Sequence, residues 1–157
     1  MRLLIIAIVA ATVGYTLSVV VNSTVSAATL VGFGIEVAVS DRLDMAITEW
    51  LGLAGTYLPI YVGLHTIVFL SLHRFLWRKG EATGRSPTER KTSFAIAGSL
   101  SLLMVYVAFD SAMGLSGVLV ASGRTVGGLL ANVATGAVSG LVFAAASGIS
   151  PKPDASD

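Results

Sequence analysis

Asp110 is the residue with the most distinctive chemical potential, because an acid beside a long apolar run is costly and is normally paired. It stands near the end of the apolar run 93–113. Arg42 and Arg124 lie in the two polar connections that we expect on the outer side of the membrane, roughly level with Asp110. We therefore predict an outer polar cluster of these three residues. Two interpretations stay open: a salt bridge that ties helix ends together, or a site for an ion or a substrate.

The two histidines do not form a metal site on one helix. His65 and His73 are eight positions apart, which is about 12 Å along a helix and too far for one metal ion or one haem. Pairs with the ligand spacing of three or four residues are absent. We predict no metal and no cofactor, and we interpret His65 as a buried polar residue. Tyr106, one turn before Asp110, belongs either to the outer cluster or to the membrane interface.

The sequence lacks the common catalytic motifs. It contains no G-x-S-x-G nucleophile motif, no phosphate-binding G-x-x-x-x-G-K-S/T loop and no H-E-x-x-H pair. The chain has no cysteine, so it has neither a thiolate nucleophile nor a disulfide. Its net charge of +1 does not indicate the clustered basic face of a nucleic-acid-binding protein. We expect neither an enzyme nor a nucleic-acid partner.

Composition indicates an integral membrane protein. Of the 157 residues, 54% are hydrophobic and only 12% are charged, about half the usual charged share, and the mean hydropathy is +0.82. Apolar runs near the length of about 20 residues that crosses a bilayer occupy 3–21, 51–76, 93–113 and 126–147. We predict an all-α fold of four transmembrane helices in one domain, 1–150, with a flexible tail, 151–157. The alternative for the first run is a signal peptide, whose apolar core is usually shorter.

Lysine and arginine predict the orientation. The connection between the second and third runs is basic, whereas the connection after the first run is acidic. By the positive-inside rule the basic connection is cytoplasmic, so both termini are cytoplasmic too. A bacterial inner membrane is the expected location. The basic residues are Arg74, Arg78, Lys79, Arg85, Arg90 and Lys91, against Glu81 and Glu89; the acidic ones are Glu36, Asp41, Asp44 and Glu49, against Arg42.

Local patterns predict several boundaries. Ser86 followed by Pro87 and Glu89 is typical of a capping box, so the third helix should start near Pro87. Residues 40–50 have the spacing of a short amphipathic helix that leads into the second span. Residues 35–39 alternate between apolar and other side chains, which predicts a short strand. Pro59 should bend the second span.

The fourth run carries a face of small residues at a spacing of four. Such a face lets another helix come close, which replaces the hydrophobic driving force that lipid does not supply. We expect its partner to be the first helix, whose own small residues would match; the alternative is a separate chain. The face consists of Gly128, Asn132, Gly136, Gly140 and Ala144, and the small residues of the first helix are Ala7, Ala10, Ala11, Gly14 and Ser18.

Two functions from different classes fit these features. The first is an interaction or structural subunit in the lipid bilayer, either as a homo-oligomer or as an accessory part of a larger membrane complex. The second is an oligomeric small channel or transporter for an ion or small solute. Residues 32–42 and 114–124 share glycine, serine and arginine at an offset of 82 positions. This likeness is either an internal repeat, as in some transporters, or chance.

Overall fold

The computed structural model describes residues 1–77, 86–113 and 125–148, apart from the side chains of residue 77 and of 108–113. All regular structure in this part of the chain is helical, without a strand, which confirms the all-α class. The helices are α1 (Arg2–Gly32), α2 (Val39–Ala54), α3 (Tyr57–Leu72), the π-helical segment η1 (His73–Trp77), α4 (Pro87–Met113) and α5 (Val126–Ser147).

Three of the helical segments are long and apolar enough to cross a membrane: α1, Tyr57–Leu76 and α5. The 31 residues of α1 measure about 46 Å, more than the roughly 30 Å of a hydrocarbon core, so α1 must tilt or project beyond it. The expected span 93–113 lies within α4, whose side chains are described only as far as Val107. The described residues thus form an all-helical fold with three segments that are long and apolar enough to cross a membrane.

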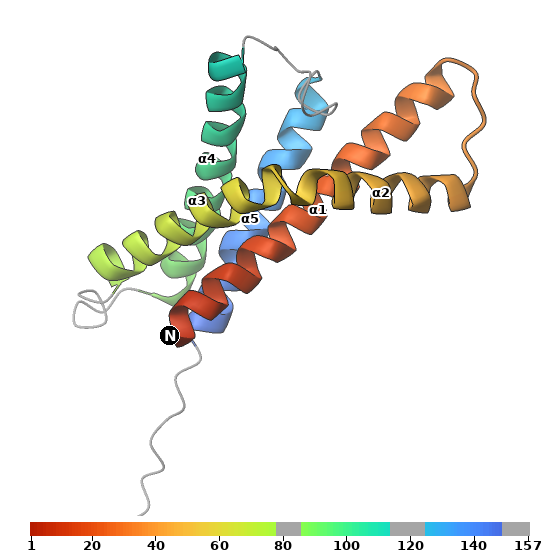
Figure 1. Cartoon of the computed structure of the whole chain (residues 1–157). Helices are drawn as coiled ribbons and strands as arrows, with labels where there is room; N and C mark the ends of the chain where they lie inside the picture. Colours follow the sequence, from red (N-terminus) through yellow and green to blue (C-terminus); the bar gives the residue numbers. More distant parts are fainter. Residues whose placement is uncertain (78–85, 114–124, 149–157) are drawn as a thin grey trace, which may run out of the picture.

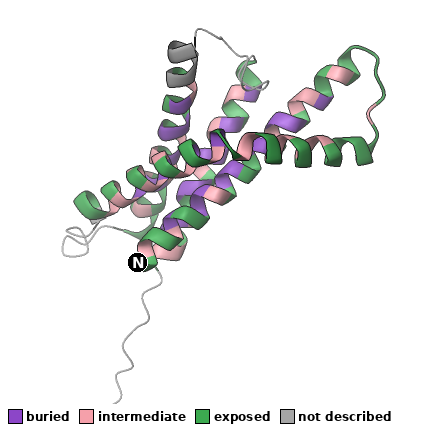
Figure 2. Ribbon diagram, in the orientation of Figure 1, coloured by how far each residue is buried: buried purple, intermediate pink, exposed green. Residues whose placement is uncertain are grey.

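The core has two halves along the bundle. At one end, α1, α3, α4 and α5 meet around Ala7, Phe69, Phe94 and Phe143. In the other half, Tyr15, Tyr57, Tyr61 and Leu102 pack together with neighbouring apolar residues of α1, α3 and α4. Figure 1 shows that the N-terminus lies near the last turn of α5, and Figure 2 shows the buried positions where the helices cross.

The expected second span is divided into two helices. The regular α-helix stops at Ala54 and resumes at Tyr57, so the break lies at Gly55 and Thr56 rather than at Pro59. Pro59 is the third residue of α3, and its ring is incompatible with the helical position of the carbonyl four residues earlier, at Gly55. The chain therefore bends one turn before the proline, and α2 forms a separate helix (Figure 1).

The predicted strand at 35–39 is wrong. α1 continues to Gly32, Gly34 adopts a positive φ of 81°, and residues 35–38 form an irregular connection before α2 starts at Val39. Ile35 and Val39 are 51 and 76% exposed and only Val37 is partly covered, so the alternating apolar side chains are not packed as one face. Without a neighbouring strand in the described chain, nothing supplies the ladder hydrogen bonds that would stabilise an extended segment.

The predicted capping box is confirmed. Glu89 N–H donates to Ser86 Oγ at 3.1 Å, and Ser86 N–H donates to a Glu89 carboxylate oxygen at 3.3 Å. α4 starts at Pro87 between these two residues. Thr125 caps α5 in a similar way, because its hydroxyl accepts a hydrogen bond of 3.0 Å from Gly128 N–H. Both helix starts are thus determined by hydroxyl residues that the sequence places next to them.

Candidate functional site: a buried polar seam

Asn132 of α5 is the centre of a buried polar network. Its Oδ1 accepts a hydrogen bond of 2.5 Å from the Ser18 hydroxyl of α1. Its amide nitrogen lies 3.3 Å from two acceptors, Asn22 Oδ1 of α1 and the Gly128 carbonyl. All four residues are buried. Asn132 thereby links two helices that each have the length and composition of a membrane span.

Two further hydroxyls on α5 extend this network along the helix. Thr135 donates to the Asn132 carbonyl at 2.7 Å, within its own helix. Ser139 donates to the Ala10 carbonyl of α1 at 2.8 Å. Asn132, Thr135 and Ser139 thus present a line of polar groups along about two turns of α5. We call the set Ser18, Asn22, Asn132, Thr135, Ser139, Tyr57, Tyr61 and His65 the polar seam.

α3 contributes the aromatic members of the polar seam at a spacing of four residues. Tyr61 and His65 are fully buried and Tyr57 is 6% exposed. His65 Nδ1 lies 2.9 Å from the Tyr61 carbonyl, which fits a tautomer that donates from Nδ1. Among the described residues, the two tyrosine hydroxyls and His65 Nε2 have no hydrogen-bond partner. Ser18 lies next to the Tyr57 hydroxyl, Thr135 next to the Tyr61 hydroxyl and the Gly98 backbone next to the His65 ring.

Aromatic rings stack along the polar seam. The Tyr61 and His65 rings are parallel, with centroids 4.1 Å apart, and His65 meets the edge of Phe69 at 5.6 Å. Tyr15 of α1 contacts Tyr57 and Tyr61 with centroids at 5.8 and 6.2 Å. Such contacts hold the rings in fixed orientations. The unpartnered polar atoms of α3 are therefore held in place by packing.

The small face of α5 packs on two helices: on α1, as the sequence suggested, through Asn132 and Ala144, and on α4 through Gly136 and Gly140. A Cβ atom at Gly136 would overlap the Gly98 carbonyl of α4, and one at Gly140 would overlap the Phe94 carbonyl. Gly98 of α4 is equally close, because a Cβ there would overlap the Gly136 carbonyl. The two backbones touch here, which is the geometry that glycine permits between membrane helices. α5 therefore presents glycines to α4 and polar groups to α1.

The small residues of α1 are buried against α5 and α3. Ala7 and Ala10 belong to the cluster that contains Ala144 and Phe143 of α5. A Cβ at Gly14 would lie 2.5 Å from the Tyr61 hydroxyl oxygen and 2.7 Å from Ser139 Cβ. Gly14 thus provides the space that the Tyr61 hydroxyl occupies.

The outer polar cluster predicted around Asp110 falls largely outside the described residues. Arg124 is not described, and Asp110 is described only as backbone in α4. Arg42 is exposed near the start of α2. Tyr106 is half-buried and packs against the cluster around Tyr15 and Tyr57. Of the predicted polar residues, the polar seam contains His65 and Asn132.

α2 is held against α1 by three side-chain contacts. The Tyr15 hydroxyl donates to the Trp50 carbonyl at 2.8 Å, and Trp50 Nε1–H donates to the Thr16 hydroxyl at 3.2 Å. Glu49 is half-buried next to Ser26. Burial raises the pKa of the Glu49 carboxyl, and the neighbouring Ser26 hydroxyl partly opposes this increase.

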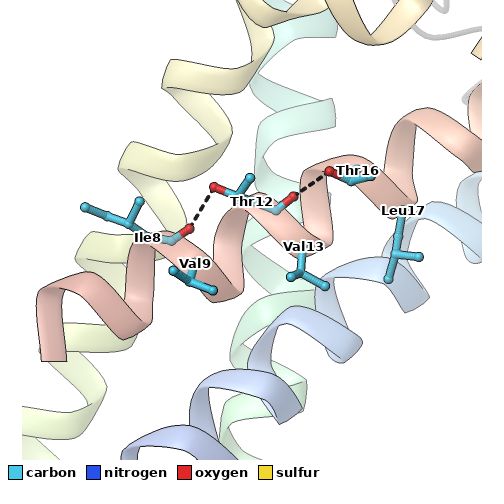
Figure 3. A pocket seen from close by; sticks show the side chains of 6 residues that line it. All are labelled: Ile8, Val9, Thr12, Val13, Thr16 and Leu17. Carbon is cyan, nitrogen blue, oxygen red and sulfur yellow. Dashed lines mark hydrogen bonds between the residues drawn. The ribbon is translucent and has the colours of Figure 1, made fainter. Parts of the chain in front are cut away.

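The outward side of α1 carries an open apolar groove of about 360 Å³. Figure 3 shows its lining, in which the Thr12 and Thr16 hydroxyls turn back to carbonyls of their own helix at 2.9 and 3.0 Å. These hydroxyls are thereby satisfied, so the groove presents mainly carbon to its surroundings. The lining residues are Ile8, Val9, Thr12, Val13, Thr16 and Leu17.

Sequence reasoning missed the partners of Asn132. Ser18, Asn22 and Ser26 follow one another at a spacing of four within an apolar helix, and this signal could have identified a polar side of α1. No three acidic or histidine side chains gather into a metal-binding group within the described ranges. No protein-family model, curated protein or solved structure matches the chain.

Proposed function

We propose that this protein is an interaction or structural subunit of a membrane, working either as a homo-oligomer or as an accessory component of a larger membrane complex. The observation that carries this proposal is the groove on α1. It lies on one of the three candidate spans, it is open and formed by α1 alone, and its apolar lining is up to 54% exposed, at Val9. A neighbouring transmembrane helix would fill it by close packing, the main attraction between helices in lipid.

The interior of the bundle supports the same role. The hydroxyls of Ser18 and Ser139 join α1 to α5, and Ser99 of α4 donates to the Val133 carbonyl of α5 at 3.1 Å. Arg90 and Ser147 join the two helices again at 2.7 Å near one end. These polar contacts hold the bundle together as a scaffold. A rigid scaffold with an unfilled groove on its lipid side suits an assembly subunit.

The test is the size of the particle in a mild detergent or in native nanodiscs. Val9→Trp and Val13→Trp fill the groove, and Ile60→Trp, at a 45% exposed position on α3, is the matched control. We expect the parent and the control to migrate as an assembly and the groove variants to migrate as single chains. A parent chain that is monomeric in native nanodiscs would contradict the proposal.

We further propose four spans, with α4 as the third and both termini in the cytoplasm. The support is the basic connection between η1 and α4 and the position of the start of α1 near the end of α5 (Figure 1). Cysteines placed at Arg85 and Ser40 should react from opposite sides of the membrane, with Arg85 reacting from the cytoplasm. Reaction of both sites from the same side would contradict this topology.

An oligomeric channel or transporter is the second candidate. The polar seam favours it, because polar groups inside membrane helices often mark a path for ions or protons. His65→Phe and Tyr61→Phe should then reduce ion or proton flux in vesicles while the melting temperature changes little. Vesicles that show no flux with the parent protein, at any tested ion gradient, would leave the polar seam with a structural role only.

A further inference from the structure

α2 exposes a regular line of aliphatic side chains. Val39, Leu43, Ile47 and Leu51 follow one another at a spacing of four, and their exposed fractions are 76, 61, 58 and 64%. Residues four apart lie on one side of a helix. We call these four residues the aliphatic stripe. No residue of α2 is fully buried, and Figure 2 shows the helix standing at the margin of the bundle.

The opposite side of α2 is acidic. Asp41 and Asp44 line a shallow depression together with Met45 and Thr48, and Glu49 borders it on the half-buried side toward α1. A third side, which includes Trp50, faces α1. The helix therefore has one side against protein, one aliphatic side and one charged side. An amphipathic helix can lie in the plane of a membrane interface, with its apolar side among acyl chains and its charged side in water.

The position of α2 in the chain brings the aliphatic stripe to the bilayer. α2 has 16 residues, about 24 Å, so it is too short to cross the hydrocarbon core. The six residues 33–38 join it to α1, and Gly55 and Thr56 join it to α3. Both neighbours belong to candidate spans. α2 also runs at an angle across α1 instead of alongside it (Figure 1). A helix tied in this way remains at the membrane surface.

The chemistry of the aliphatic stripe favours lipid as its occupant. Its members are branched aliphatic side chains, without the aromatic or arginine residues that are enriched at protein interfaces. Outward-facing aliphatic residues of the adjoining spans, Val20 of α1 and Ile60 of α3, are exposed to a similar degree, 49 and 45%. Trp50 and Tyr15 meet on the protein side of α2, and such aromatic residues are enriched at the interface level.

We propose that α2 is an interfacial helix whose aliphatic stripe inserts between the acyl chains of one leaflet while its acidic side faces water. Lipid then covers Leu43 and Ile47, and Asp44 and Thr48 remain hydrated. This inference does not depend on the α1 groove or on any oligomer. It assigns a lipid-binding surface to a helix that is itself too short to cross the membrane.

Because the chain has no cysteine, a single introduced cysteine can report on each side of α2. Leu43→Cys and Ile47→Cys probe the aliphatic stripe, and Asp44→Cys and Thr48→Cys are the matched controls on the acidic side. Each variant is labelled with an environment-sensitive fluorophore and reconstituted into phosphatidylcholine vesicles. Two quenchers are compared, a nitroxide attached high on the acyl chain and iodide in the water. Circular dichroism and the elution profile exclude misfolded variants.

We expect stripe labels to emit at shorter wavelength and to be quenched several-fold more by the lipid nitroxide than by iodide. The control labels should show the reverse order. Equal iodide quenching on both sides would overturn the proposal. The nitroxide could also quench the stripe labels only after the protein is diluted in excess lipid. That result would overturn the proposal as well, because it would show that another copy of the chain covers the stripe at ordinary protein density. If the protein is found to be monomeric while the stripe labels are still quenched as expected, only the proposed function is contradicted.

Discussion

Ser18 donates a hydrogen bond of 2.5 Å to Asn132 and so connects α1 to α5 across 114 positions of the sequence. Asn132 is fully buried, and its amide group reaches Asn22 one turn further along α1. In lipid no water competes for these groups, but an unfolded membrane helix also finds other partners. The network therefore determines which side of α1 faces α5 more than it determines the total stability.

Replacing Asn132 by leucine should destabilise the bundle, because leucine has a similar size but forms no hydrogen bond to Ser18. We expect a loss of about 1 to 2 kcal/mol in unfolding free energy, measured by denaturant titration in micelles. Thr12→Val is the control, since the Thr12 hydroxyl bonds only to its own helix. If Asn132→Leu and Thr12→Val cost the same, the link between α1 and α5 contributes nothing specific.

Gly140→Ala should separate α4 from α5. A Cβ there would overlap the Phe94 carbonyl, which is backbone and cannot rotate away. Overpacking of this kind costs roughly 1 to 3 kcal/mol, and the melting temperature should fall accordingly. Gly127→Ala provides the control within the same helix, because a Cβ at Gly127 meets nothing within 4 Å. Equal melting temperatures for both variants would refute the close contact between the two helices.

Gly14→Ala should also destabilise the bundle, and a second substitution tests the reason. The added methyl group would meet the Tyr61 hydroxyl, so Tyr61→Phe removes one of the two obstacles. Ser139 Cβ remains as the other. The melting temperature of the double variant should lie above that of Gly14→Ala, although below that of Tyr61→Phe. Simple additivity of the two changes would show that Gly14 and Tyr61 do not meet.

The sequence predicted the features that depend on neighbouring residues. The start of α4 follows from Ser86 and Glu89, and the amphipathic character of α2 follows from the spacing of Leu43 and Ile47. The bend near Pro59 was also predictable, but its position was not. The ring of Pro59 acts on the carbonyl four residues earlier, so the break lies one turn before the proline.

Features that depend on helix order in space could not be predicted. Gly136 and Gly140 show that α5 accepts a close neighbour, but glycine has no side chain to select α1 or α4. Phe94 and Gly98 of α4 lie within an ordinary apolar pattern, so nothing in the sequence indicated their backbone contact with α5. The strand expectation failed for a similar reason, since alternation in residues 35–39 specifies a face but not a partner strand.

Glu49→Gln should stabilise the protein at neutral pH. Glu49 is half-buried between α2 and α1, and burial raises its pKa above the ordinary value of 4.5. The folded state thus binds this proton more tightly than the unfolded state does. Stability from Glu49 is fully present below the ordinary pKa and is lost as the pH rises through the raised pKa of the folded state. Glutamine is neutral at every pH, so the stability of the Glu49→Gln variant should not decrease in this way as the pH rises.

The measurement is the melting temperature in detergent between pH 4 and pH 8, for the parent protein and for Glu49→Gln. The two curves should converge at the acidic end and separate as the pH increases, with the variant above the parent. Asp44→Asn removes one negative charge from the same helix at an exposed position and serves as the control. The separation should be small, because the Glu49 carboxyl is only partly buried and water screens it. If Asp44→Asn produces the same separation, the net charge of α2 is the cause and the burial of Glu49 is not.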